Sequence, residues 1–328
     1  MKTLLVTGGA GFIGSCFIRY ILSKYKDYKV INLDALTYAG NIKNLDDVKD
    51  NPNYQFVHGN ICDKVLVKNL VRQADIIVNF AAESHVDRSI TGPEIFIETN
   101  VKGTLNLLQI AKEVGIEKYL QVSTDEVYGT LSKEGYFYET TPLAPNSPYS
   151  ASKASADMLV RAYHETYGLP TLITRCSNNY GPYQYPEKLI PFFISKLKRG
   201  EKVPVYGDGL NVRDWLYVYD HCAAIDTVIH KGRIGEVYNV GGHNEKTNLE
   251  ITKLILDKMG KDESYIEHVT DRLGHDRRYA ISNDKISSEL GWKPSVTFEE
   301  GIELTINWYL NNMDWIEEIE RKKKELTL

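Results

Sequence analysis

A glycine-rich turn near the amino terminus stands between a short apolar run and a segment with helical spacing. Leu4–Val6 is continuously apolar, which is typical of a strand buried inside a parallel sheet. Gly8, Gly11 and Gly14 follow, and the apolar spacing of Phe12–Ile21 predicts a helix. In this context glycines let the backbone approach a pyrophosphate, and the helix amino terminus attracts its charge. The opening therefore predicts a dinucleotide-binding βαβ unit, although an ordinary tight turn would also use such glycines.

An acidic residue ends the second apolar run. Tyr28–Leu33 predicts a strand, and Asp34 follows it at the spacing that a dinucleotide fingerprint requires. A carboxylate there accepts hydrogen bonds from an adenosine ribose and repels a 2′-phosphate, and Ala35–Thr37 brings no arginine. We therefore expect NAD rather than NADP as the cofactor. The alternative is an aspartate that serves only in a turn or a helix cap.

Apolar runs and helical segments continue to alternate through the first half of the chain. Further strands are expected at residues 54–58, 75–80, 118–123 and 170–175, and long helices at 95–114 and 149–167. This order predicts an α/β fold, a Rossmann-type doubly wound parallel sheet with a smaller, mixed α/β carboxyl-terminal substrate domain. The expected boundaries are residues 1–175, with a returning segment at about 214–242, for the first domain, and 176–213 with 243–328 for the second.

Charge and cysteine usage argue against several classes of protein. The 328 residues carry a formal net charge of −5, which argues against a general nucleic-acid binder. The four cysteines, Cys16, Cys62, Cys176 and Cys222, are scattered, so we expect free thiols in a reducing, cytoplasmic setting and no metal site. No apolar stretch approaches the length that spans a bilayer, so we expect no membrane partner.

Two adjacent carboxylates and a tyrosine–lysine pair carry the expected chemistry. Asp125 and Glu126 follow closely on the strand expected at residues 118–123. Tyr149 and Lys153 lie one helical turn apart on a shared face, as in hydride-transfer sites where a lysine makes a tyrosine more acidic. Because simple hydride transfer needs no further acids, the combination predicts a site that also removes a proton and protonates a leaving hydroxyl. Most Asp-Glu pairs are solvated loop residues, which is the alternative here.

Taken in order, these motifs make the chain resemble the extended short-chain dehydrogenase/reductase superfamily. The likeness rests on TGGAGFIG, NFAAESHVD, STDEVYG and YSASK. Two downstream segments, RCSNNYGP at 175–182 and YPEKLIP at 185–191, are more specific. With them, the chain resembles the dTDP-glucose 4,6-dehydratase family over essentially its whole length.

The resemblance implies a reaction cycle on dTDP-glucose in which NAD takes hydride from carbon 4 and later returns it to carbon 6. The ketone formed at carbon 4 makes the proton on carbon 5 removable, so water can leave across carbons 5 and 6. In that cycle Tyr149, assisted by Lys153, is the base for the carbon-4 hydroxyl, and Thr124 hydrogen-bonds its oxygen. Glu126 removes the carbon-5 proton, and Asp125 protonates the leaving hydroxyl.

The resemblance also implies two sets of binding residues. Those expected to hold NAD are Gly8, Gly11, Phe12, Ile13, Gly14, Asp34, Asn60, Ile61, Ala81, Ala82, Thr99, Tyr149, Lys153 and Asn179. Those expected to hold the nucleotide sugar are Ser84, Thr124, Asn178, Lys188, Leu189, Tyr206, Arg213, Asn248, Arg272 and His275. Arginine suits a diphosphate because its fork donates two parallel hydrogen bonds, and Tyr206 is the candidate to stack on the base.

Alternatives from other classes stay open at this point. A nucleotide-sugar 4-epimerase or decarboxylase would need the tyrosine and NAD, but not Asp125 and Glu126. A 4,6-dehydratase of a UDP- or CDP-sugar would differ only in a few loop contacts. A regulatory protein that merely binds NAD would not need an intact Tyr149 and Lys153. The family also pairs through two long helices, so we expect a homodimer whose four-helix bundle uses residues 95–114 and 149–167.

Overall fold

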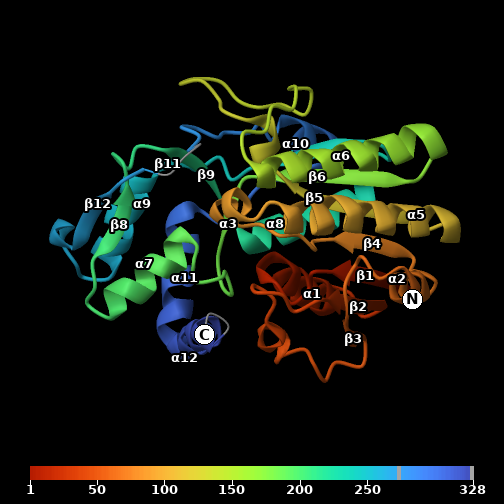
Figure 1. Ribbon diagram of the computed structural model, residues 1–328, viewed down its shortest axis with the longest axis horizontal. Coiled ribbons are helices and arrows are strands. Elements are labelled where there is room, and N and C mark those ends of the chain that lie inside the picture. The colour runs from red at the N-terminus through yellow and green to blue at the C-terminus, as the bar shows by residue number, and fades with distance from the viewer. Residues whose placement is uncertain (272–274, 326–328) are drawn as a thin grey trace.

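A seven-stranded parallel sheet forms the centre of the amino-terminal lobe in the computed structural model (Figure 1), which describes residues 1–271 and 275–325. The strand order is β10-β6-β5-β4-β1-β2-β3. The strands are β1 (Lys2–Thr7), β2 (Tyr28–Asp34), β3 (Tyr54–His58), β4 (Ile76–Asn79), β5 (Lys118–Thr124), β6 (Thr171–Cys176) and β10 (Val237–Val240). The order reverses between β1 and β4, and such a reversal leaves a crevice at the carboxyl ends of the strands. The doubly wound sheet predicted from the sequence is confirmed.

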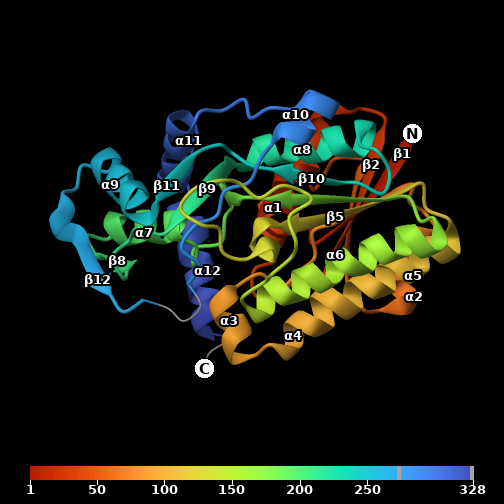
Figure 2. The ribbon, with the colours of Figure 1, turned by 90° about the horizontal axis from the view of Figure 1, so that it is seen from above.

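Helices cover both faces of this sheet, as Figure 2 shows from above. One face carries α1 (Phe12–Lys24), α8 (Val218–Lys231) and α10 (Asp284–Leu290), and the other carries α2 (Lys64–Val71), α5 (Thr104–Val114) and α6 (Pro148–Tyr167). Leu4 and Val6 pack in the cluster under α1 and α8, whereas Leu5 packs in the cluster under α2 and α5. Burial on both faces explains why the run Leu4–Val6 is apolar without alternation.

The long helix expected at 95–114 is interrupted, so that prediction was wrong in part. The segment begins as α4 (Glu94–Phe96), continues as a π-helical stretch, η2 (Ile97–Gly103), and becomes regular only in α5. Asn100 lies within the π stretch, and its side-chain amide is bonded to both backbone groups of Glu83 and to the Ser152 hydroxyl. The wider π-helical turn therefore holds the buried Asn100 side chain against the loop that follows β4. Such π-helical stretches are frequent at functional sites.

A smaller lobe combines a mixed sheet, a second short sheet and four helices. The three-stranded sheet has the order β11 (Glu245–Thr247), β9 (Val212–Tyr217) and β7 (Asn178–Tyr180), and the two-stranded one pairs β12 (Ile266–Val269) with β8 (Val203–Tyr206). The helices are α7 (Leu189–Lys198), α9 (Asn248–Lys258), α11 (Phe298–Asn311) and α12 (Met313–Glu325). Remaining short elements are η1 (Ile42–Leu45), α3 (Val86–Thr91), η3 (Asp125–Tyr128) and η4 (Glu263–Tyr265). This lobe has its own apolar core, which includes Tyr180, Phe298 and Ile316. The exact domain boundaries stay a prediction.

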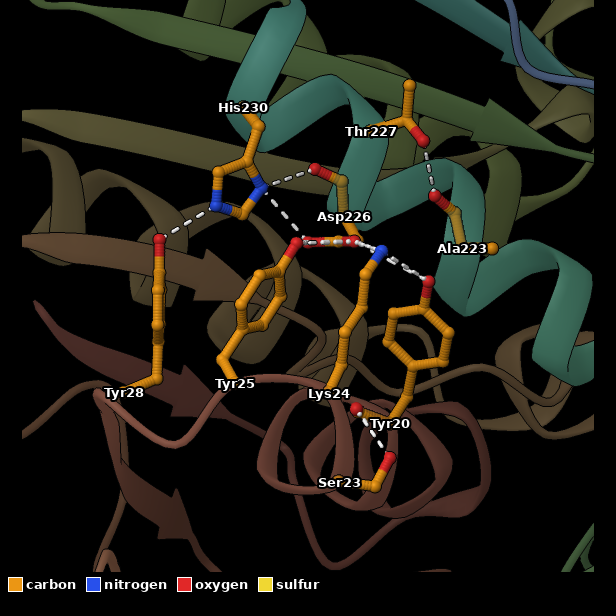
Figure 3. Close-up of polar contacts among 9 residues, drawn as sticks. All are labelled: Tyr20, Ser23, Lys24, Tyr25, Tyr28, Ala223, Asp226, Thr227 and His230. Carbon is orange, nitrogen blue, oxygen red and sulfur yellow. Dashed lines mark hydrogen bonds and ion pairs between the residues drawn. The ribbon is translucent and has the colours of Figure 1, made fainter.

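A buried carboxylate joins α1 to α8 on the outer face of the large sheet (Figure 3). Asp226 on α8 is almost fully buried, and it accepts hydrogen bonds from Lys24 at 2.6 Å and from Tyr25 at 3.0 Å. His230, one turn further along α8, pairs with the same carboxylate at 2.9 Å, and its other ring nitrogen lies 2.7 Å from the Tyr28 hydroxyl. This network fixes the carboxyl end of α1, whose amino end follows the glycine turn.

The four cysteines are all free, and Cys16, Cys176 and Cys222 are buried. Within residues 1–271 and 275–325, no helix combines the length and the apolar character that crossing a membrane demands.

Candidate active site

The glycine turn between β1 and α1 is too tight for side chains. Gly8 adopts the left-handed conformation, with φ of +71°, and a Cβ there would meet the backbone of Ala81 at 2.6 Å. A Cβ on Gly14 would meet the Gly8 carbonyl at 2.4 Å. Because Gly11, the N-cap of α1, has no side chain, no side-chain cap occupies the first-turn N–H groups. These groups form an anion site of the kind that suits a diphosphate.

Asp34 ends β2 and faces the same turn. Its Oδ2 accepts a hydrogen bond from the backbone N–H of Ala10, and its Oδ1 accepts one from Leu36, each at 2.8 Å. Burial raises the pKa of the Asp34 carboxyl, and these two N–H donors oppose that rise. Asp34 therefore stabilises the backbone of the turn through these two hydrogen bonds. Each of its oxygens keeps a further lone pair, which a ribose hydroxyl could use.

A cavity of about 320 Å³ runs from Asp34 along the carboxyl ends of the strands. Its lining includes every residue that the sequence proposed for NAD and all five proposed catalytic residues, namely Gly8, Gly11, Phe12, Ile13, Gly14, Asp34, Asn60, Ile61, Ala81, Ala82, Thr99, Thr124, Asp125, Glu126, Tyr149, Lys153 and Asn179. The long cavity, the uncapped helix amino terminus and the acidic strand end together fit a dinucleotide.

The two carboxylates at the end of β5 have different surroundings. Thr124 caps the short helix η3 by accepting a hydrogen bond from the backbone N–H of Glu126. Asp125 is 1% exposed, and its Oδ2 has no hydrogen-bond partner among the described residues. Burial raises the pKa of Asp125 well above its ordinary value, and the nearby charges of Glu126 and Asp214 raise it further. These surroundings favour the protonated form of Asp125, whereas Glu126 is only partly buried.

Tyr149 and Lys153 begin α6, where the sequence placed them. Pro148 is the first residue of this helix, and Ser147 caps it together with Ser150. Tyr149 is 8% exposed; burial and then the charge of Glu126 raise the pKa of its phenol, and a hydrogen bond with Thr124 opposes them. The Lys153 ammonium donates to the Val122 carbonyl at 2.8 Å, and burial lowers the pKa of Lys153.

The expectation that Lys153 and the positive nicotinamide ring together make Tyr149 more acidic concerns the cofactor-bound site and stays a prediction. Without the cofactor, desolvation and the charge of Glu126 are the largest causes of the raised Tyr149 pKa, and the Lys153 ammonium is bonded to a backbone carbonyl.

A second cavity, of about 240 Å³, opens from the first towards the smaller lobe. The two cavities share Ser84, Glu126, Asn178, Glu187 and Lys188. The second is also lined by Leu189, Tyr206, Arg213, Asn248 and His275, which the sequence proposed for the nucleotide sugar. Arg272 of that set lies outside the described residues. The shared wall puts the second cavity directly beside the acidic pair.

Hydrogen bonds fix several of these groups before any ligand enters. The Arg213 guanidinium donates to the Asp276 carbonyl at 2.9 Å and lies 4.5 Å from the centre of the Tyr279 ring. His275 pairs with Asp271 at 2.6 Å and meets the Tyr206 ring edge to face. Preset side chains of this kind lower the ordering cost of binding.

Two ionisable side chains near Glu126, the Glu187 carboxyl and the Tyr279 phenol, were not proposed from the sequence. Glu187 lines both cavities, and its Oε1 lies 3.7 Å from the Nε2 of His85. Burial, and next the charge of Glu126, raises the pKa of Tyr279. Their positions in the sequence could have indicated them, since Glu187 directly precedes Lys188 and Tyr279 follows shortly after His275.

Comparison with known proteins gives a consistent result. The family model described as GDP-mannose 4,6 dehydratase matches residues 5–305. A dTDP-glucose 4,6-dehydratase from Xanthomonas campestris pv. campestris is 56% identical, with 97% of this chain and 95% of the relative covered.

Solved structures agree with the sequence relatives. The dTDP-glucose 4,6-dehydratase of Bacillus anthracis in complex with NAD superimposes with a TM-score of 0.92 at 55% identity, covering 97% of this chain and 100% of that one. DesIV, a dTDP-glucose 4,6-dehydratase from Streptomyces venezuelae with NAD and TYD bound, has a TM-score of 0.95 at 52% identity and the same coverage. The chain therefore belongs to the dTDP-glucose 4,6-dehydratase family of the extended short-chain dehydrogenase/reductases.

Proposed function

We propose that this protein is an NAD-dependent lyase that converts dTDP-glucose to dTDP-4-keto-6-deoxyglucose and water. The observation that carries the proposal is the pair Asp125 and Glu126, which lies in one cavity with Tyr149 and Lys153. A hydride-transfer site alone needs only the tyrosine and the lysine. A buried acid with a raised pKa beside a second carboxylate adds what an elimination requires.

Tyr149 and Lys153 of α6 serve the oxidation and reduction steps. When bound, NAD accepts hydride from carbon 4, later supplies it to carbon 6, and brings a positive ring that favours the tyrosinate. Tyr149 takes the proton of the carbon-4 hydroxyl, and Thr124 orients that oxygen by a hydrogen bond. Lys153 would hold the ribose end of the cofactor with a further N–H donor and would add positive charge to the site.

The elimination step uses Asp125 and Glu126 of η3, directly after β5. Glu126 removes the proton on carbon 5, which the carbon-4 ketone has made acidic. Asp125 gives its proton to the carbon-6 hydroxyl, which leaves as water with the electron pair of the broken C–O bond. The proton held by Glu126 then returns to carbon 5 while hydride arrives at carbon 6. Tyr149 releases the proton that it took from the carbon-4 hydroxyl and Asp125 takes one up, so each turnover loses one water and restores every residue. The raised pKa of Asp125 supports this assignment, because burial favours the protonated form that a general acid needs.

Binding roles follow the two cavities. The first-turn N–H groups of α1 would take the cofactor diphosphate, Asp34 the adenosine ribose, and Asn60 the adenine edge. In the second cavity Arg213 would take a sugar-nucleotide phosphate, and Tyr206 offers a half-exposed ring to the base. The assignment of dTDP rather than UDP or CDP rests on the high identity to dTDP-glucose 4,6-dehydratases.

We also propose a homodimer that joins through α5 and α6, two copies of each forming a four-helix bundle. The support is a set of exposed apolar side chains on η2, which leads into α5, and on α6: Ile97 is 48%, Met158 45% and Tyr167 53% exposed. Clusters of exposed apolar side chains mark interaction surfaces. Free cysteines support a cytoplasmic location, where thiols stay reduced.

The experiment is mass analysis of the products formed when dTDP-, UDP- and CDP-glucose are offered separately with NAD. We expect dTDP-glucose to give a product lighter by one water, and the other two to react slowly. A product of unchanged mass would favour a 4-epimerase, and preferential turnover of UDP- or CDP-glucose would reassign the base.

A further inference from the structure

The carboxyl-terminal helix reaches from the smaller lobe to the loop that supports the glycine turn. Ile316 of α12 is completely buried in the core of the smaller lobe, and Glu320 pairs at 3.0 Å with Arg199, the residue that caps the carboxyl end of α7. On its other side, Glu318 pairs with Lys43 of η1 at 2.6 Å. Helix α12 is therefore anchored in one lobe and in contact with the other, and Figure 1 shows it at the junction of the two.

One side chain, Asn44 of η1, connects this helix to the turn. Asn44 is 1% exposed. Its Oδ1 accepts a hydrogen bond from the indole N–H of Trp315 at 2.9 Å, and its Nδ2 donates to the Ala10 carbonyl at 3.0 Å. Chemistry fixes the orientation of the amide, because an indole can only donate and a carbonyl can only accept.

Ala10 lies on the buried side of the turn, behind the residues that line the cofactor cavity. Its carbonyl accepts from the Asn41 backbone as well as from Asn44, and its N–H donates to Asp34. Both backbone groups of Ala10 are thus held by residues of the β2–η1 segment. Without the indole donor, the Asn44 oxygen would be buried and unsatisfied, so the amide would rotate or admit water and loosen its bond to Ala10.

We propose that Trp315 and Asn44 are positioning residues that hold the glycine turn in its cofactor-binding shape, so that α12 braces the NAD site from the other lobe. The inference rests on the proposed function, since it takes NAD to be the occupant of the first cavity. Neither side chain lines that cavity, so both act through Ala10.

The test uses Trp315→Phe, which removes the N–H donor and keeps an aromatic ring. Trp308→Phe is the matched control, because Trp308 belongs to the same aromatic cluster, with its ring 5.4 Å from that of Trp315. Asn44→Asp is a second variant: it keeps an acceptor for the indole and replaces the donor to Ala10 with an oxygen. Titration calorimetry measures NAD binding to each protein, and hydrogen exchange measures the backbone amides of residues 8–14 without NAD.

Trp315→Phe and Asn44→Asp should each weaken NAD binding by roughly 5- to 50-fold and speed exchange at residues 8–14. Trp308→Phe should lower the melting temperature by about as much as Trp315→Phe does. It should nevertheless leave the NAD affinity and the exchange rates at residues 8–14 near the wild-type values. Equal effects of the two tryptophan variants on NAD affinity and amide exchange, or amide exchange at the wild-type rate in Trp315→Phe, would contradict the proposal that α12 positions the glycine turn. If wild-type protein binds no NAD, the proposed function fails, and the exchange readout still decides whether the brace exists.

Discussion

Two neighbouring carboxyl groups at the end of β5 differ in burial, and this difference assigns their roles. Asp125 is enclosed and its pKa is raised, whereas Glu126 has access to the cavities on both sides. An acid and a base can therefore coexist on adjacent residues. Each role makes its own prediction, because the residues act on different bonds after hydride has left carbon 4.

Glu126→Gln should separate oxidation from elimination. With dTDP-glucose it should still form some enzyme-bound NADH, seen by absorbance, because Tyr149 is intact. It should lose exchange of solvent deuterium into carbon 5, because no base remains to remove that proton. Asp125→Asn should keep part of this exchange and release water slowly. Normal carbon-5 exchange in Glu126→Gln would remove Glu126 from the mechanism.

Tyr149→Phe should cut turnover by roughly 10²- to 10⁴-fold, the range for losing a general base. Binding of dTDP-glucose, measured by calorimetry, should change little, because the ring is kept. Tyr163→Phe on the same helix lies outside both cavities and serves as the control. Turnover near wild type in Tyr149→Phe would show that another group takes the carbon-4 proton.

Residue spacing and position at strand ends made several of the site residues predictable from the sequence. Tyr149 and Lys153 follow from helical periodicity, and Asp34 follows from its place at a strand end. Glu187 and Tyr279 come from segments far along the chain, and only the packing of the smaller lobe brings them to Glu126. The pKa direction of Tyr149 also required the structure, since burial is a property of the folded chain.

Among the elements, the contact between α1 and α8 carries the clearest pH dependence (Figure 3). The hydrogen bond with Asp226 raises the pKa of His230 above its ordinary value, with partial burial opposing it. Burial would raise the pKa of Asp226, but hydrogen bonds from His230 and Lys24 outweigh it and lower that pKa. Lys24, Tyr25 and Tyr28 face the same pair from α1 and β2.

The stabilisation from His230 should be complete below about pH 6.5, the unfolded value, and should fade as pH rises through the raised folded pKa. The part from Asp226 is present above its unfolded pKa of about 3.9 and is lost only in acid. Urea unfolding of wild type and His230→Gln should therefore differ most near pH 6 and least near pH 9. A difference that stays constant across that range would contradict the pairing.

Element types were predictable where periodicity was strong and failed where one polar side chain decided the geometry. Strands β1 to β6 and helix α6 were expected close to their observed places. The π-helical stretch η2 was not, because its cause is the bonding of Asn100 to the Glu83 backbone across the loop after β4. Sequence periodicity contains no record of such a long-range contact.

For the whole molecule, the exposed apolar side chains on η2 and α6 predict the assembly. Met158→Glu places a charge in the proposed four-helix bundle, so it should shift the protein from dimer to monomer in light scattering after size exclusion. Leu304→Glu, on an exposed apolar residue of α11, is the control and should leave the mass unchanged. A monomeric wild type, or an unaffected Met158→Glu dimer, would rule out this interface.

The relation between the lobes was the least predictable feature at this scale. The cavities that meet at Glu126 are lined by residues from both lobes, and α12 connects the smaller lobe to the glycine turn through Asn44. The sequence indicates each lobe by its own pattern, but the contacts between them depend on the folded surfaces.

The most direct measurement follows a deuterium label placed on carbon 4 of dTDP-glucose. The proposed cycle removes this hydride and returns it within the same active site after water has left. The label should therefore appear at carbon 6 of the same product molecule, and that product should be lighter than the substrate by one water. Label that returns to carbon 4 in a product of unchanged mass would contradict the dehydratase and establish an epimerase instead.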